Sequence, residues 1–405
     1  MTECRDSPVP DDEALPRFAS GGPDAEAFGA SAGYPIGDRA GPVDVSSLVG
    51  RYSHLDEIFP ARSIRKAPTP SHLVRVVEPP IFWRFEDAEL TVDDYLARNP
   101  ITRFLIARGD TILVERYQYA RTDRQRFTSW SMAKTVTAML VGIAIAEGHI
   151  GSVDDLAAAY VPDLAGTEYG RTSLRHLLQM SSGVRFSEEY TGSDDVSRLA
   201  AETFQLRGPG GPSAVLPFNE RAVPAGTRFS YSSAETQVLG LVLRAATGHP
   251  LAEYLESRIW QPIGAEADAT WLVDNAGQEA AYCGLNAVLR DYARLGLLLA
   301  RGGQWHGRQV FPEAWILEAT TVRADQPHLQ PGTATPGVGY GNHTWILPGE
   351  GRMFSLWGVR GQRIFVDPRS KLVMVKTAVH KQPNDPRPTL EGEAMWLALV
   401  RQFGG

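Results

Sequence analysis

Cysteine is nearly absent from this sequence, which has only Cys4 and Cys283 in 405 residues. Cys4 lies in a segment with no periodic apolar pattern, so a native disulfide is not expected and a reducing compartment is favoured. The first residues also lack the basic start and apolar stretch of a secretory signal, and carry acids and prolines instead. These absences predict a cytoplasmic protein.

Long apolar runs and an excess of positive charge are missing as well. The longest apolar run, residues 138–146, is far shorter than the 18 or more residues of a membrane span. The net charge of −7 is spread along the chain, which argues against nucleic acid or an anionic membrane as a partner. The nine histidines show no metal-ligand spacing, so no metal site is expected.

The distribution of apolar residues indicates where strands, helices and irregular segments lie along the chain. Residues 1–45 are rich in glycine, proline, alanine and aspartate and are expected to form a poorly ordered arm. Residues 103–119 predict two strands joined by a Gly-Asp turn. Residues 151–275 contain mainly helical patterns separated by turns. Further strands are expected at 341–347, 363–367 and 371–379, and helices at 131–148, 173–180, 234–247, 250–260, 288–301 and 391–403.

This order of elements predicts an α+β fold with three layers, α/β/α. One antiparallel sheet would be built from both ends of the chain, residues 46–150 and 276–405, and helices would flank it. The mostly helical region 151–275 would be inserted between the two halves of this sheet domain.

Lysine is also scarce, since only five of the 40 basic residues are lysines. Lys134 stands in the apolar helix expected over 131–148, which has no need of a surface charge. Arginine cannot deprotonate in a protein, whereas a desolvated lysine can. Ser131 precedes Lys134 by three residues, which places both on one face of the helix at its N-terminus. We therefore interpret Ser131 as a nucleophile and Lys134 as its activating base.

Two other serines match nucleophile motifs in unsuitable contexts. Ser63 and Lys66 repeat the Ser-x-x-Lys spacing, but the prolines around them exclude a buried helix. Ser31 lies in a Gly-x-Ser-x-Gly match, a motif that works between a strand and a helix. No strand is expected before Ser31, so neither serine is interpreted as catalytic.

Three segments in a fixed order resemble the family of serine β-lactamases and penicillin-binding proteins. They are Ser131-Met-Ala-Lys134, then Tyr231-Ser-Ser233, then the strand-like segment 355–368. The resemblance covers about residues 100–400. Within that family the chain is most similar to the 6-aminohexanoate-dimer hydrolases and related esterases, which share the Tyr-x-Ser element and an acidic pair followed by tyrosine, here at 188–190.

The resemblance implies a β-lactamase/transpeptidase-like fold and an acyl-enzyme mechanism without a cofactor. Ser131 would attack a carbonyl, Lys134 would take its proton, and Tyr231 would relay a proton to the leaving group. The backbone N–H groups of Ser131 and Val359 would form the oxyanion hole. The residues expected to contact the substrate are Tyr190, Ser233, Trp357, Gly358 and Arg360.

The third motif departs from the family pattern. Leu356-Trp357-Gly358 stands where β-lactamases have Lys-Thr-Gly, which grips the β-lactam carboxylate, and either Arg360 or Arg363 could partly replace the missing cation. Lys376-Thr377-Ala378 is a second candidate for this motif, but it lacks the glycine that lets the backbone approach a substrate.

These departures favour hydrolysis of small carboxylic esters or linear amides. The alternatives are a class C-like β-lactamase or D,D-peptidase, and a non-catalytic binding or sensor protein on the same scaffold. The expected partner is a small ester or amide substrate, and the sequence does not indicate an oligomeric state.

Overall fold

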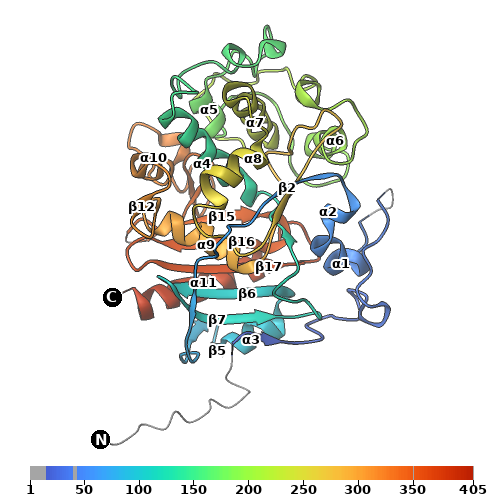
Figure 1. The fold of residues 1–405 in the computed structure, drawn as a ribbon, viewed down its shortest axis with the longest axis vertical. Helices are drawn as coiled ribbons and strands as arrows, with labels where there is room; N and C mark the ends of the chain where they lie inside the picture. The colour runs from blue at the N-terminus through green and yellow to red at the C-terminus, as the bar shows by residue number, and fades with distance from the viewer. Residues whose placement is uncertain (1–14, 40–42, 350, 405) are drawn as a thin grey trace, which may run out of the picture.

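The computed structural model describes residues 15–39, 43–349 and 351–404, and its main sheet occupies the lower half of the view in Figure 1. As predicted, the middle of the sheet contains strands from both ends of the chain. The order there is β7-β6-β17-β16-β15, and each neighbouring pair is antiparallel. The strands are β6 (Ile101–Arg108), β7 (Thr111–Tyr117), β15 (Phe354–Gly358), β16 (Gln362–Asp367) and β17 (Leu372–Ala378).

At its edges the sheet differs from the prediction. It is mixed rather than wholly antiparallel, because β1 and β3 both pair with β7 in the parallel direction. No hairpin joins either short strand to β7, so nothing imposes an antiparallel direction. The single strand expected over 341–347 is a hairpin, closed where Gly341 N donates to Thr344 O at 2.8 Å. These edge strands are β1 (Arg17–Phe18), β3 (Val74–Arg75), β13 (Gly339–Tyr340) and β14 (Trp345–Ile346).

Helices cover both faces of the sheet, which confirms the three-layer prediction. In β17, Val373 and Val375 belong to the core that includes α9, whereas Leu372 and Met374 belong to the core that includes α11. This alternation follows from the two-residue period of a strand. The elements around these cores are α3 (Val92–Arg98), α9 (Leu289–Ala300), α10 (Glu313–Ala319), α11 (Pro386–Phe403), β4 (Phe82–Phe85), β5 (Ala88–Thr91), β11 (Gln304–Trp305) and β12 (Arg308–Gln309).

The helical region lies above the sheet in Figure 1. Its central helices α4 and α7 pack against each other. Helix α4 is buried along nearly its whole length, as its apolar sequence requires. The helices here are α4 (Met132–Ala146), α5 (Leu174–Leu178), α6 (Asp195–Glu202), α7 (Ser233–Thr247) and α8 (Leu251–Leu255), which continues as a π-helical turn (Glu256–Trp260).

A second sheet, which the sequence analysis did not predict, leads the chain to Ser131. Its strand order is β2-β9-β10-β8. Directly after β8, Ser129 N donates to Leu285 O at 2.7 Å, so pairing with the β10 strand continues almost to the nucleophile. This pairing fixes the start of α4. The strands are β2 (Ala61–Ile64), β8 (Phe127–Thr128), β9 (Ala269–Leu272) and β10 (Leu285–Ala287).

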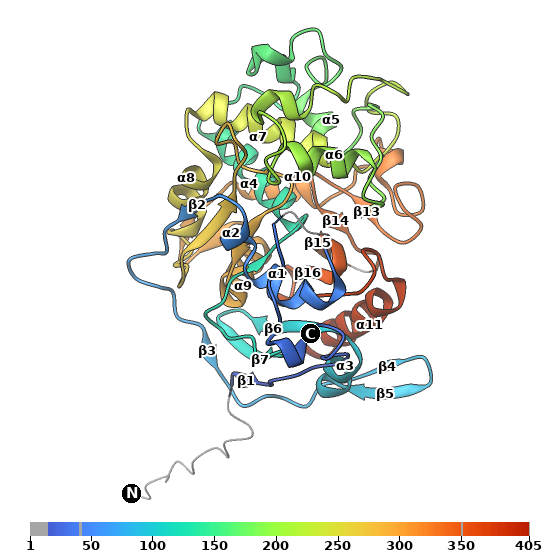
Figure 2. The same cartoon turned by 90° about the vertical axis from the view of Figure 1, so that its right-hand side faces the viewer.

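The N-terminal segment is packed over the part that the structure describes, which corrects the expectation of a poorly ordered arm. Phe28 is fully buried, and its ring meets that of Tyr119 edge-on at 5.7 Å. Tyr34 packs against the same ring. Irregular turns around single aromatic anchors hold residues 15–39, so no helical or strand period marks this packing in the sequence. The segment continues into α1 (Leu48–Ser53) and α2 (Leu55–Ile58), shown in blue in Figure 2.

Cys4 lies outside the described residues, and Cys283 is a buried free cysteine. Within residues 15–39, 43–349 and 351–404, no helix has both the length and the apolar character that crossing a membrane requires.

Candidate active site

Ser131 lies at the N-terminal end of α4, directly after a strained residue. Trp130 has a φ of 44°, in the left-handed region that a bulky side chain rarely adopts. Its ring is held edge-on by Tyr52 at 5.2 Å and by Phe204 at 6.3 Å. This turn between β8 and α4 places Ser131 on the wall of two adjoining cavities.

Lys134 is beside Ser131, as the three-residue spacing predicts. A hydrogen bond of 2.9 Å joins Lys134 Nζ to Ser131 Oγ, and a second of 2.9 Å joins it to Ser233 Oγ. Lys134 Nζ also donates to Tyr282 O at 3.4 Å. The lysine is only 1% exposed, so its amine is shielded from bulk water and directed at the candidate nucleophile.

Glu188 is a site residue that the sequence analysis did not select. Its side chain is 3% exposed and lies 4.0 Å from Lys134 Nζ. Ser233 donates to it from Oγ at 2.9 Å and from the backbone N at 2.7 Å, and Tyr190 OH donates at 3.0 Å. The acidic pair before Tyr190 was visible in the sequence, but which carboxylate turns inward depends on the loop.

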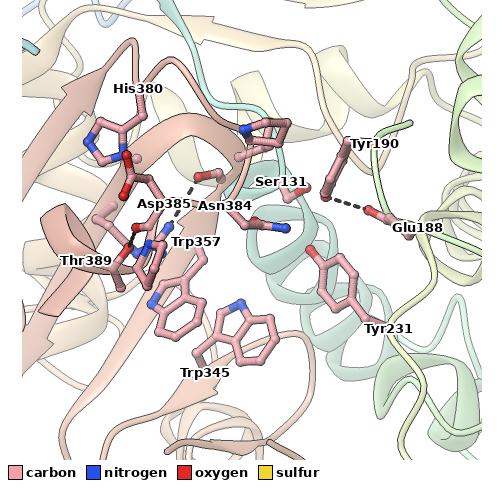
Figure 3. Close-up of a pocket in the computed structure, with 16 residues that line it drawn as sticks. Ser131, Glu188, Tyr190, Tyr231, Trp345, Trp357, His380, Asn384, Asp385 and Thr389 are labelled. Carbon is pink, nitrogen blue, oxygen red and sulfur yellow. Dashed lines mark hydrogen bonds between the residues drawn. The ribbon is translucent and has the colours of Figure 1, made fainter. Parts of the chain in front are cut away.

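The Tyr231 hydroxyl points toward Ser131, as the close-up in Figure 3 shows. Lys134 Nζ lies 4.7 Å from the centre of its ring. Burial raises the pKa of Tyr231, while the charge of Lys134 opposes that rise. The predicted trio Ser131, Lys134 and Tyr231 therefore comes together, although Ser131 and Tyr231 are 100 residues apart in sequence.

A cavity of about 420 Å³ opens on the Tyr231 side of Ser131, and we call it the tryptophan cavity. Its wall includes Trp345 and Trp357, whose rings stack at 4.5 Å. The guanidinium of Arg363 lies 4.2 Å from the centre of the Trp357 ring. Burial lowers the pKa of Arg363 to about 10. Arg360 and Arg363 were the two candidates to replace the missing cation, and of these only Arg363 lines this cavity.

A second cavity of about 660 Å³ adjoins the first at Ser131, and we call it the arginine cavity. Arg51, Arg207 and Arg360 line it, so the predicted substrate residue Arg360 does not share a cavity with Arg363. The two cavities share five lining residues, which are Ser131, Glu188, Tyr190, Val359 and Pro383.

The end of β15 lies directly against the nucleophile segment. A Cβ on Gly358 would come within 2.5 Å of Ser129 O, so no other residue fits there without a shift. This close approach brings Val359 to the edge of both cavities beside Ser131, where the two were expected to provide the oxyanion hole.

Lys376, in the second candidate for the third motif, lies elsewhere. Its Nζ donates to Tyr95 OH at 2.8 Å, and Tyr95 belongs to the core on the α11 face of the sheet. Burial lowers the pKa of Lys376 to about 7, but neither cavity at Ser131 includes it. Trp357 and Gly358 do line the tryptophan cavity, so Leu356-Trp357-Gly358 stays the candidate for the third motif.

Ser31 and Ser63, the two other serines that match nucleophile motifs, do not line either cavity at Ser131. Ser31 is exposed in a 3-10 turn and donates to Glu26 Oε2 at 2.5 Å, and Ser63 lies in β2. No group of three or more His, Cys, Asp or Glu side chains suited to a metal ion occurs among the residues with described placement.

Comparison with known proteins gives matches over most of the chain. The family model described as Beta-lactamase matches residues 91–398. A 6-aminohexanoate-dimer hydrolase from Paenarthrobacter ureafaciens is 27% identical over 341 residues, which are 82% of this chain and 86% of that protein. A β-lactamase from Pseudomonas fluorescens is 27% identical over 146 residues, 35% of this chain and 36% of that protein.

Solved structures share the fold. A protein from Bacillus anthracis, provisionally named a 6-aminohexanoate-dimer hydrolase, superposes with a TM-score of 0.81 at 24% identity and covers 90% of this chain and 97% of its own.

Proposed function

The chain belongs to the beta-lactamase family and is a serine hydrolase. From this premise we propose that it cleaves small carboxylic esters through an acyl-enzyme on Ser131, and that it cleaves linear amides more slowly. The observation that carries the proposal is the 2.9 Å hydrogen bond between Lys134 Nζ and Ser131 Oγ in a buried setting that opens onto two cavities. A nucleophile and its base within hydrogen-bond reach are the signature of this chemistry.

In the acylation step, Ser131 Oγ forms a bond to the substrate carbonyl carbon and passes its proton to the Lys134 amine. The negative charge that develops on the carbonyl oxygen is stabilised by the backbone N–H groups of Ser131 and Val359. The bond to the leaving group then breaks, Tyr231 gives its proton to the departing oxygen or nitrogen, and Lys134 returns a proton to Tyr231.

In the deacylation step, water attacks the acyl carbon and the ester bond to Ser131 breaks. Lys134 and Tyr231 receive the proton of the water and return one to Ser131 Oγ. Ser233 and Glu188 support this cycle, because their hydrogen bonds fix the position of the Lys134 amine between its partners.

Esters should react faster than linear amides because an ester has the better leaving group, whereas an amide nitrogen must be protonated as it departs. Tyr190 is the candidate for orienting an amide leaving group. Its OH donates a hydrogen bond to the Glu188 carboxylate, and both residues line the tryptophan cavity together with Ser131.

The alternative reading is a β-lactamase or D,D-peptidase, and the family supports it in general terms. Leu356 and Trp357 supply neither the cation nor the hydroxyl that would bind a β-lactam carboxylate. Arg363 places a cation nearby, but on a different strand and stacked against a tryptophan ring.

Comparing kcat/KM for p-nitrophenyl butyrate, 6-aminohexanoate dimer and nitrocefin under one condition tests the proposal. We expect the ester to be hydrolysed fastest and nitrocefin only in traces. Equal turnover of nitrocefin and the ester would favour the β-lactamase reading. Intact mass after treatment with a fluorophosphonate probe should show one adduct that Ser131→Ala does not form, and no adduct on the wild-type protein would favour a non-catalytic sensor.

A further inference from the structure

The arginine cavity is positively charged, although the chain as a whole carries a net charge of −7. Arg51 comes from α1, Arg207 follows α6, and Arg360 follows Val359 directly. Glu188 is the single acidic side chain among the described residues that line the cavity. Its oxygens are already bonded to Ser233 and Tyr190. The cavity therefore holds cations without a matching carboxylate.

Arg51 and Arg360 are held in place by backbone oxygens rather than by acids. Arg51 Nη1 donates to Asp38 O at 2.9 Å, and Arg360 Nη1 donates to His380 O at 2.7 Å. Neither guanidinium has an ion-pair partner within the described ranges of the chain. Arg360 Nη1 also donates to Lys381 O, and the Tyr52 hydroxyl is a further hydrogen-bond partner of Arg360. Both guanidinium groups are therefore fixed in position, and each retains N–H groups that could donate to a bound ligand.

The two guanidinium groups lie near one shared hydroxyl. Burial raises the pKa of Tyr52 to about 12, and the charges of Arg360 and Arg51 oppose that rise. Tyr52 also lines the arginine cavity and packs against Trp130, the residue before the nucleophile. Arg51, Tyr52 and Arg360 therefore form one donor cluster within the cavity next to Ser131.

Two neighbouring arginines without counter-ions are costly unless an anion offsets them. Arg51 is buried, which lowers its pKa, yet an arginine side chain does not give up its proton in a protein. Its planar fork matches the two oxygens of a carboxylate, so a bound carboxylate would recover the lost solvation through charge-assisted hydrogen bonds.

Tyr231 decides which part of the substrate enters this cavity. It lines the tryptophan cavity and is absent from the lining of the arginine cavity. The group that protonates the leaving atom must lie beside it, so the leaving group occupies the tryptophan cavity. The carbonyl oxygen takes the oxyanion hole, which leaves the arginine cavity for the acyl chain.

We propose that the arginine cavity selects acyl groups that end in a carboxylate, such as the half-esters and half-amides of short dicarboxylic acids. This inference rests on the proposed acyl-enzyme mechanism and names its substrate class. The apolar side chains of Leu55, Phe59 and Phe204 line the same cavity and suit the methylene groups between the two carboxyl ends. An acyl chain that ends in an ammonium group would be repelled.

Three p-nitrophenyl esters with six-carbon acyl chains test the proposal, because they differ only at the far end of the chain. They are the adipate half-ester, the hexanoate ester and the 6-aminohexanoate ester. At low salt, kcat/KM for the adipate half-ester should exceed that for hexanoate by roughly 10-fold or more, with the ammonium-ended ester lowest. The adipate preference should fall as salt rises.

Arg360→Asn and Arg51→Gln should each bring the adipate-to-hexanoate ratio close to one. Asparagine tolerates the positive φ of 59° at position 360, so the backbone beside Val359 is kept. Arg51 lies outside that turn, so the second variant separates the loss of charge from any change at the oxyanion hole. Arg363→Gln is the matched control, because it removes an arginine that lines the tryptophan cavity and should keep the ratio.

A wild-type ratio near one, with hexanoate hydrolysed normally, would overturn the inference alone. A ratio lost in Arg363→Gln but kept in the other two variants would also overturn it, because the carboxylate would then bind in the tryptophan cavity. If none of the three esters is cleaved and Ser131 takes no phosphonate, the proposed function fails and this inference fails with it.

Discussion

The two cavities that meet at Ser131 are built from different parts of the chain and carry different chemistry. The tryptophan cavity is formed largely by the C-terminal half, with stacked Trp345 and Trp357 and one arginine over a ring. The arginine cavity draws on α1 and α2, which precede the residues 91–398 that match the family model. The reaction centre lies between them and belongs to both.

This contrast indicates that bond cleavage and substrate choice are separable in this protein. In the proposed mechanism the trio Ser131, Lys134 and Tyr231 would act on any carbonyl that reaches it, whereas the charge on each side would select the substrates that bind. Changes to the shared centre should affect all substrates equally, and changes to one cavity should affect only substrates that carry the matching group.

The largest effect is expected at Ser131, the candidate nucleophile that lines both cavities. Ser131→Ala should lower ester hydrolysis on the order of 10⁴-fold or more, for every acyl and leaving group, and should abolish phosphonate labelling. Ser31→Ala is the matched control and should retain both. Labelling that survives in Ser131→Ala and is lost in Ser31→Ala would move the nucleophile to the N-terminal segment.

The next effect is expected at the base. Lys134→Arg keeps the charge but cannot accept a proton, so it should be nearly as inactive as Lys134→Ala, with a loss of about 10²–10⁴-fold in kcat. The loss should be the same for the adipate and hexanoate esters. An arginine variant that keeps more than roughly a tenth of the wild-type kcat would assign Lys134 an electrostatic role instead.

Arg363 should affect only the leaving-group side. For Arg363→Gln, kcat/KM for 4-carboxyphenyl butyrate should fall by roughly 10-fold or more, the loss of one charge-assisted hydrogen bond, while phenyl butyrate changes little. The two esters share one acyl group, so their ratio measures the tryptophan cavity alone. An equal fall for both would show that Arg363 supports the Trp357 ring and contacts no substrate.

A smaller effect is expected at Tyr190, which borders both cavities. Tyr190→Phe removes the hydrogen bond to Glu188, so hydrolysis of a linear amide should fall by roughly 2–10-fold, with the matching ester much less affected. Tyr160→Phe is a suitable control, since it removes a tyrosine–carboxylate bond to Asp155 away from both cavities. An equal loss on ester and amide would limit Tyr190 to shaping the site.

The last expected effect concerns acid stability rather than catalysis. His343 is buried in the β13–β14 turn, bonds Thr236 at 3.0 Å, and has its pKa lowered by burial to about 3. It is neutral in the folded protein, and the unfolded chain binds its proton below about pH 6.5. Stability is therefore lost as pH falls through that range, by about 2 kcal/mol at pH 5.

Urea unfolding at pH 7 and pH 5 measures this loss in the free energy of unfolding. The wild-type protein should lose about 2 kcal/mol more between the two pH values than His343→Asn, which keeps a residue tolerant of the positive φ of 51°. Equal losses in the two proteins would assign the acid sensitivity to other groups.

Much of the fold and the reaction centre could be predicted from local signals. The scarcity of lysine singled out Lys134, and the helix spacing joined it to Ser131, because both signals are local. The central strands were predicted for the same reason. The hairpin at 341–347, the parallel edge strands and the second sheet were missed, because strands of two to four residues have too few side chains to show a period.

The sequence by itself predicted the candidate nucleophile and its candidate base, since their pairing depends on neighbours three residues apart, and it showed the order of motifs that the family shares. Only the tertiary structure decided which cavity each arginine enters, because Arg360 and Arg363 are three residues apart in sequence and yet line different cavities. It also brought Arg51 and Glu188 to the site. Such placements depend on contacts between distant segments, and no local pattern encodes them.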